Sequence, residues 1–186
     1  MLVFTGTHAT LGGVGRVLVP ATTRRLLTGW LALAMGSIVV AGIFAILVAF
    51  TRTPVVRLLG SANAFHVALV AHVTFAFTVW FVAFAGALWI YAAWRANYRL
   101  NAPLSWAGLA LASAGAGAMA VPAFIFRGHP YLNDYVPVID HPLFWAGLSA
   151  VGAGVSLQAL AYLWGWRRAR RHAGSAPDAH SRAVPE

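Results

Sequence analysis

The chain of 186 residues contains no cysteine, no lysine and only four acidic residues. The missing cysteine excludes disulfides, thiolate zinc sites, iron–sulfur clusters and covalent c-type heme attachment within this chain. Charged residues make up 9% of the sequence, roughly a third of what a soluble domain of this size carries. With 60% hydrophobic residues, the chain has too little charge to cover itself in water, and we predict an integral membrane protein.

All 13 basic residues are arginine, a usage typical of high-GC bacterial genomes. We therefore expect a multi-pass protein of the bacterial inner (plasma) membrane. The net charge of +9 is a feature of some nucleic-acid-binding proteins, but here the arginines are scattered over loops and tails. They are better explained as topology signals, and no nucleic acid is expected as a partner.

Four apolar runs predict an all-α bundle of four transmembrane helices, at residues 26–50, 62–94, 104–126 and 142–166. Each run meets the requirement of about 20 apolar residues for crossing a bilayer. Pro142 suits the first turn of the last helix, where its missing N–H is harmless. The membrane domain is then 26–166, between a cytoplasmic segment 1–25 and a basic, disordered cytoplasmic tail 167–186.

The distribution of arginine predicts the orientation of the bundle. If both ends are cytoplasmic, ten arginines lie inside, and only Arg52, Arg57 and Arg127 lie outside. Because positive residues concentrate in cytoplasmic segments, an N-in/C-in topology is favoured. The third and fourth runs are rich in alanine and glycine, which let helices approach closely. We expect packing within the bundle or against other membrane subunits, in addition to the lipid bilayer.

Two histidines lie in the second run, which has no charged residue between Arg57 and Arg95. An imidazole inside a membrane helix is a candidate functional site. By helix geometry His72 lies about 9 Å deeper than His66 and is rotated by about 120° from it, so the two do not share one face. His72 needs a polar partner at this depth, and both a structural hydrogen bond and metal or heme ligation remain open.

A second candidate site lies at the predicted outer face, where topology gathers His66, His129 and His141. Asp134 and Asp140 belong to the same outer loop. Imidazole and carboxylate groups together bind copper or another transition metal, and a carboxylate also orients a neighbouring imidazole. The alternatives are interhelical hydrogen bonding for His66, an exposed loop position for His129, and a structural helix start for Asp140 and His141.

The segment FHVALVAH at residues 65–72 resembles the start of the second helix in subunit I of heme-copper oxidases. In that helix an aromatic residue, a polar residue and several apolar residues precede the histidine that ligates the low-spin heme. The resemblance implies that His72 is an axial ligand of a heme of b or a type. His141 or a residue of a partner chain would supply the other ligand, and His66 is a further cofactor-binding candidate.

The chain departs from that family because it has only four spans. The later helices, which carry the copper ligands and the active-site heme ligand, have no counterpart here, so the chain alone is not a complete oxidase. We expect a redox subunit of an oxidoreductase complex that exchanges electrons with a periplasmic cytochrome or quinol. The alternatives are a structural accessory subunit of a respiratory or photosynthetic complex, or a copper protein that uses His66, His129, His141 and Asp140.

Overall fold

The computed structural model describes residues 19–53, 62–132 and 137–174. Long apolar helices form nearly all of this part of the chain. They are α1 (Ala21–Thr51), α3 (Ala62–Val73), η1 (Thr74–Val79), α4 (Trp80–Arg95), α5 (Ala102–Phe124) and α6 (Pro142–Gly174). Because α3, η1 and α4 run on without a break, the helices provide four spans that are long and apolar enough to cross a membrane. The predicted all-α, four-span architecture is confirmed.

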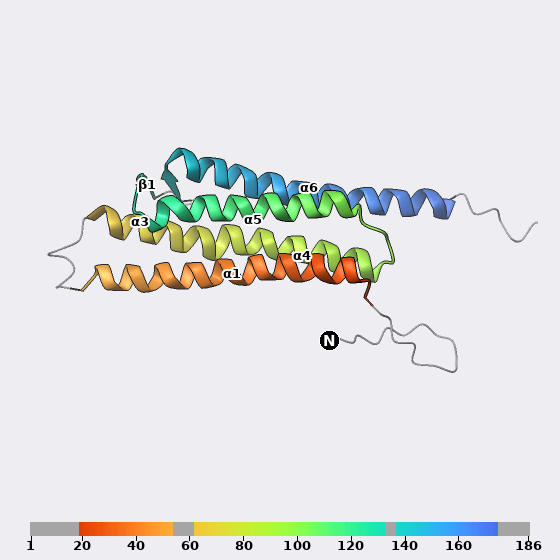
Figure 1. Cartoon of the computed structure of the whole chain (residues 1–186), viewed down its shortest axis with the longest axis horizontal. Coiled ribbons are helices and arrows are strands. Elements are labelled where there is room, and N and C mark those ends of the chain that lie inside the picture. Colours follow the sequence, from red (N-terminus) through yellow and green to blue (C-terminus); the bar gives the residue numbers. More distant parts are fainter. Residues whose placement is uncertain (1–18, 54–61, 133–136, 175–186) are drawn as a thin grey trace, which may run out of the picture.

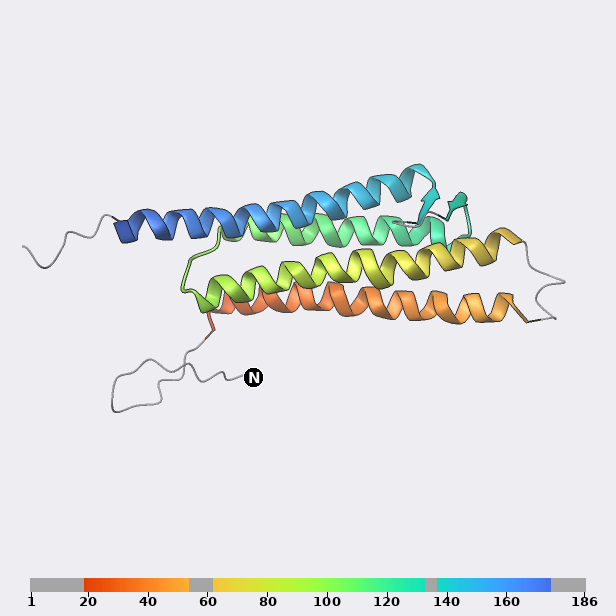
Figure 2. The same ribbon diagram turned by 180° about the vertical axis from the view of Figure 1, so that it is seen from behind.

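The four spans form two antiparallel pairs that lie side by side (Figures 1 and 2). In the first pair α1 packs along the continuous helix of α3, η1 and α4. In the second pair α5 packs along nearly its whole length against α6. The described chain begins and ends at the same end of the bundle, as an even number of spans requires (Figure 1).

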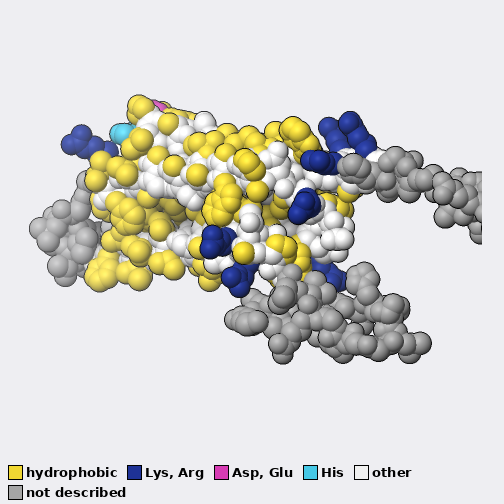
Figure 3. Space-filling model, turned by 45° about the vertical axis from the view of Figure 1, so that its right-hand side comes forward, with side chains coloured by type: hydrophobic (Ala, Val, Ile, Leu, Met, Phe, Trp, Pro, Cys, Tyr) yellow, Lys and Arg dark blue, Asp and Glu magenta, His cyan; other side chains and the backbone are white. Residues whose placement is uncertain are grey.

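Arginine marks the two ends of the bundle unequally. The end where α1 starts and α6 finishes carries Arg24, Arg25, Arg95, Arg99, Arg167, Arg168, Arg170 and Arg171, whereas the opposite end carries Arg52 and Arg127 among the described residues. Between the ends the surface is mainly hydrophobic (Figure 3). We call the first the arginine-rich end; it is the end that the positive-inside rule predicts to be cytoplasmic.

The ends of two helices differ from the predicted domain boundaries. Helix α6 continues to Gly174, so residues 167–174 are helical and do not belong to a disordered tail. Arginine and alanine are strong helix formers, and they extend the last span beyond its apolar part. Helix α1 begins at Ala21, inside the predicted segment 1–25. The rest of the two predicted tails, residues 1–18 and 175–186, lies outside the described part.

Close approach of α5 and α6 depends on glycines at their contact. A Cβ atom at Gly115 would lie 2.6 Å from the carbonyl oxygen of Gly147, and one at Gly154 would lie 2.6 Å from the amide nitrogen of Ala112. Only glycine fits at such distances. Two buried clusters fill the rest of the interior, one around Phe44 and Phe144 in the outer half and one around Trp30 in the half near the arginine-rich end.

The connection 96–101 between α4 and α5 is held against α6 at the arginine-rich end. The ring of Tyr98 lies 5.9 Å from that of Tyr162, measured between ring centroids. Desolvation, together with a hydrogen bond between the two hydroxyl groups, raises the pKa of Tyr98 above its ordinary value. Gly165 leaves room for the carbonyl oxygen of Arg99, which would lie 2.8 Å from a Cβ atom there. The connection is therefore a fixed part of this surface.

A short hairpin at the opposite end was not predicted. Strands β1 (His129–Tyr131) and β2 (Val138–Asp140) pair antiparallel, with His129 opposite Asp140. Ile139 is fully buried, and the Asn63 side chain donates to the Gly128 carbonyl at 3.4 Å. The hairpin therefore packs over the start of α3 (Figure 1).

Candidate functional site

His72 lies in α3 at the interface with α1. Its Nδ1 atom is 2.9 Å from the carbonyl oxygen of Ala41, a residue that is itself buried in α1. The His72 side chain as a whole is half-buried. The residue lies about 14 Å along the helix from Asn63, at 1.5 Å per residue, so this contact is well inside the apolar part of the span.

The contact with Ala41 defines the tautomer of a neutral His72 ring. A carbonyl oxygen only accepts hydrogen bonds, so Nδ1 must carry the proton. The lone pair of the neutral imidazole is then on Nε2. Histidines that bind metals have this arrangement, in which one ring nitrogen donates to a carbonyl and the other ligates the metal. The tautomer of His72 is therefore compatible with metal ligation as well as with a structural hydrogen bond.

Small residues flank His72 on its own helix. Its neighbours four residues before and after it, on the same face of the helix, are the small residues Ala68 and Ala76. Ala68 is buried and Ala76 is half-buried. On the facing helix a Cβ atom at Gly42, next to Ala41, would meet nothing within 4 Å. The half-buried histidine therefore lies at the edge of the α1–α3 contact.

A π-helical segment follows His72 directly. The α-helix changes to η1 at Thr74, and π-helical turns occur frequently at functional sites. The Thr74 hydroxyl oxygen is 2.8 Å from the carbonyl oxygen of Val70 and 2.9 Å from that of Pro137. Because Pro137 precedes β2, this contact fixes the outer loop to the helix that carries His72. The sequence analysis missed Thr74, and its only signal was a hydroxyl inside an apolar run.

The outer histidines have separate surroundings. The ring of His66 packs edge-on against Phe65, with centroids 5.1 Å apart. His129 is exposed and lies opposite Asp140 in the hairpin. His141 directly precedes α6, where its Nδ1 accepts a hydrogen bond from the backbone N–H of Leu143 at 3.2 Å. The last contact corresponds to the predicted helix-start role of His141.

The copper site predicted from these residues is not assembled in the described part of the chain. No three histidine, aspartate or glutamate side chains come close enough there to hold a metal ion, and Asp134 lies outside the described residues. The first turn of α6 already engages two of the four candidates, because Trp145 also donates to the Asp140 carboxylate at 3.3 Å.

The two predicted heme ligands, His72 and His141, contact different helices. His72 is bonded to α1, whereas His141 directly precedes α6, whose main partner is α5. His66 is rotated away from His72 by about 120° on the same helix. Of the three, His72 is the one whose ring bonds to the backbone of a neighbouring span.

Three buried polar side chains near the arginine-rich end escaped the sequence analysis. Gln158 is fully buried in α6, and neither atom of its amide has a hydrogen-bond partner. Ser105 on α5 and the indole nitrogen of Trp30 on α1 are likewise buried and unpaired. Gly108 on α5 faces Gln158, which places Ser105 at about the same level. In the sequence, Gln158 could have been noticed as a lone glutamine within an apolar run.

Searches against protein-family models, curated proteins and solved structures find no match to the chain.

Proposed function

We propose that the protein is a membrane-embedded redox subunit that holds a heme of b or a type through Nε2 of His72. The observation that supports this most strongly is the 2.9 Å contact between Nδ1 of His72 and the Ala41 carbonyl oxygen. In apolar surroundings it leaves an oriented imidazole with its lone pair on the other nitrogen. A bound heme supplies reversible one-electron chemistry at its iron.

The chain's own residues have distinct roles in this proposal. The Ala41 carbonyl orients the imidazole of His72 and raises its basicity as a ligand. Ala68 and Ala76 keep the same face of the helix free of large side chains one turn before and after the ring. Thr74 ties the outer loop to the same helix, which limits the entry of water. Ala41 acts on His72 through a hydrogen bond, and Ala68 and Ala76 act through their small size.

A second ligand to the heme iron would come from a partner subunit. His141 already caps α6, and His66 is rotated by about 120° from His72 on the same helix. His72 is half-buried beside the open surface at Gly42, where a neighbouring membrane helix has access. The heme would then lie between two chains and be part of an oxidoreductase complex.

The depth of His72 favours an electron donor or acceptor on the side away from the arginine-rich end. That side is periplasmic if the positive-inside rule holds in a bacterial inner membrane. A periplasmic cytochrome or a quinol in the outer leaflet fits this position. The complex should be purified intact from membranes, and its dithionite-reduced visible spectrum recorded. Heme bands in proportion to this subunit support the proposal, whereas their absence contradicts it.

A structural accessory subunit of a respiratory or photosynthetic complex is the second candidate function. It is favoured by small residues on the lipid-facing side of α5 and α6. Cβ atoms at Gly117 and Gly152 would meet nothing within 4 Å, and Ala110, Ser113 and Ala114 are also exposed. Exposed small residues suit close packing against another membrane helix. A complex that contains this chain in fixed proportion but no heme would favour this function.

A further inference from the structure

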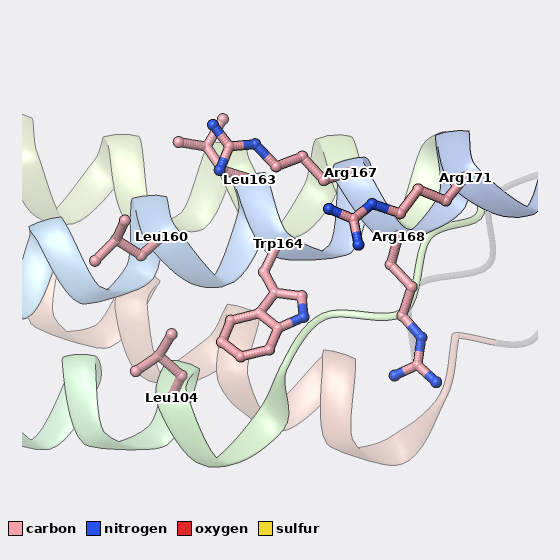
Figure 4. Close-up of a pocket in the computed structure, with 7 residues that line it drawn as sticks. All are labelled: Leu104, Leu160, Leu163, Trp164, Arg167, Arg168 and Arg171. Carbon is pink, nitrogen blue, oxygen red and sulfur yellow. The ribbon is translucent and has the colours of Figure 1, made fainter.

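An open groove of about 850 Å³ lies between α5 and α6 at the arginine-rich end. Its lining residues are Leu104, Leu160, Leu163, Trp164, Arg167, Arg168 and Arg171. All but Leu104 belong to α6, at spacings of three and four residues that keep them along one side of the helix. Figure 4 shows the Trp164 indole between α6 and the start of α5, and the side chains of Arg167 and Arg171 extending back along α6.

Along α6 the apolar lining residues of the groove come first and the arginines follow. Leu160, Leu163 and Trp164 lie on the membrane side, and their exposed fractions are 54%, 40% and 60%. The arginines follow where the span leaves the bilayer. This order matches a phospholipid, whose acyl chains lie in the hydrocarbon region and whose phosphate lies at the interface with tryptophan.

Arg167 and Arg168 of the groove have no balancing carboxylate in the described part of the chain. The only acidic residue described there is Asp140, at the other end of the bundle. Arg99 adds further charge, because it lines a second hollow of about 490 Å³ on the same surface, together with Trp164 and Arg168. Arg170 does not line the groove. Its guanidinium carbon lies over the ring of Trp166, 4.6 Å from the ring centroid.

We propose that this groove binds an anionic phospholipid of the leaflet at the arginine-rich end. The phosphate pairs with the guanidinium groups of Arg167 and Arg168, and an acyl chain packs on Leu160, Leu163 and Trp164. Arginine suits this role because its planar group forms two parallel hydrogen bonds to phosphate oxygens. Basic pockets between membrane helices bind acidic headgroups in this way. The connection 96–101, held by Tyr98 against Tyr162, lines the adjacent hollow through Arg99, Leu100 and Asn101.

The test compares lipid selectivity in the full chain reconstituted into phosphatidylcholine bilayers. Spin-labelled phosphatidylglycerol and phosphatidylcholine report the fraction of each lipid held at the protein surface by electron paramagnetic resonance. The variant R167Q/R168Q removes two charges from the groove. The matched control R24Q/R25Q removes two adjacent exposed arginines from α1 at the same end of the bundle, outside the groove.

We expect the wild type to prefer phosphatidylglycerol, and R167Q/R168Q to lose about fivefold or more of that preference, since each arginine near the surface contributes about a fivefold factor. The control R24Q/R25Q should keep most of it. Trp164→Ala, which leaves every charge in place, should lower the fraction of phosphatidylglycerol held at the protein surface, because the acyl chain loses a contact. Equal losses in the two arginine pairs would overturn the proposal, because the effect would then be a general property of this end.

Inorganic phosphate distinguishes a lipid site from a simple anion site. At about 10 mM, phosphate shares the charge of the headgroup but has no acyl chain for Leu160 and Trp164. It should leave the binding of phosphatidylglycerol unchanged at constant ionic strength. If phosphate displaces the lipid, or if Trp164→Ala has no effect, the groove recognises only the anion and the assignment to a phospholipid is wrong.

Discussion

The Nδ1 atom of His72 on α3 lies 2.9 Å from the carbonyl oxygen of Ala41 on α1. This hydrogen bond joins two spans inside the apolar part of the bundle and also leaves Nε2 as the atom with a lone pair. A purely structural histidine needs only the first property, whereas a heme ligand needs both. A substitution that keeps the hydrogen bond to Ala41 but removes Nε2 therefore distinguishes the two candidate functions.

His72→Asn and His72→Leu should differ in stability. The asparagine amide reaches about as far as Nδ1 and retains a donor for Ala41, whereas leucine retains none. We expect His72→Leu to lower the free energy of unfolding by about 1 kcal/mol, and His72→Asn to lower it by less. Reversible unfolding of the cofactor-free chain in detergent micelles measures both. If the two variants are equally stable, the bond to Ala41 contributes nothing to the α1–α3 interface.

Gly115 and Gly117 on α5 form a matched pair for testing the α5–α6 contact. A Cβ atom at Gly115 would lie 2.6 Å from the Gly147 carbonyl oxygen, whereas one at Gly117 would meet nothing within 4 Å. Gly115→Ala should therefore cost about 1–3 kcal/mol, the usual range for overpacking. Gly117→Ala should be neutral or slightly stabilising, since alanine favours helix. Thermal denaturation of both variants checks this, and a tolerated Gly115→Ala would contradict the observed spacing of the helices.

Gln158 is buried and has no hydrogen-bond partner among the described residues. Gln158→Leu keeps a similar volume and removes both unpaired groups, and it should be neutral or raise the unfolding free energy by about 1 kcal/mol. The same unfolding measurement applies. A clear loss of stability in Gln158→Leu would mean that the amide has a partner in the membrane, such as an ordered water or another subunit.

Thr74 and Thr51 provide a further comparison. The Thr74 hydroxyl contacts a distant carbonyl, that of Pro137, in addition to Val70 in its own helix. Thr51 bonds only to Val48 of its own helix. Thr74→Val should therefore cost about 1 kcal/mol more than Thr51→Val, and it should increase proteolysis near the hairpin 129–140. Equal effects would show that the Pro137 contact does not hold the outer loop.

The spans were predictable because each needs only a long apolar run, and Pro142 is the observed start of α6. Other features of the structure depend on contacts between residues far apart in the sequence, which an apolar run does not reveal. The π-helix at Thr74 coincides with a bond to Pro137, 63 residues away. Strands as short as His129–Tyr131 give no periodic signal. A polar partner was predicted for the buried His72, but its identity, Ala41, depends on how α1 packs.

The visible spectrum of the purified complex containing His72→Asn tests the central claim most directly. This variant keeps a donor for Ala41 but has no atom equivalent to Nε2, so packing is retained and ligation is not. The account predicts that the heme bands of the wild-type complex disappear or fall steeply while the amount of this subunit stays the same, and that His66→Asn leaves them in place. Unchanged heme bands in His72→Asn would contradict the assignment of His72 as an axial ligand.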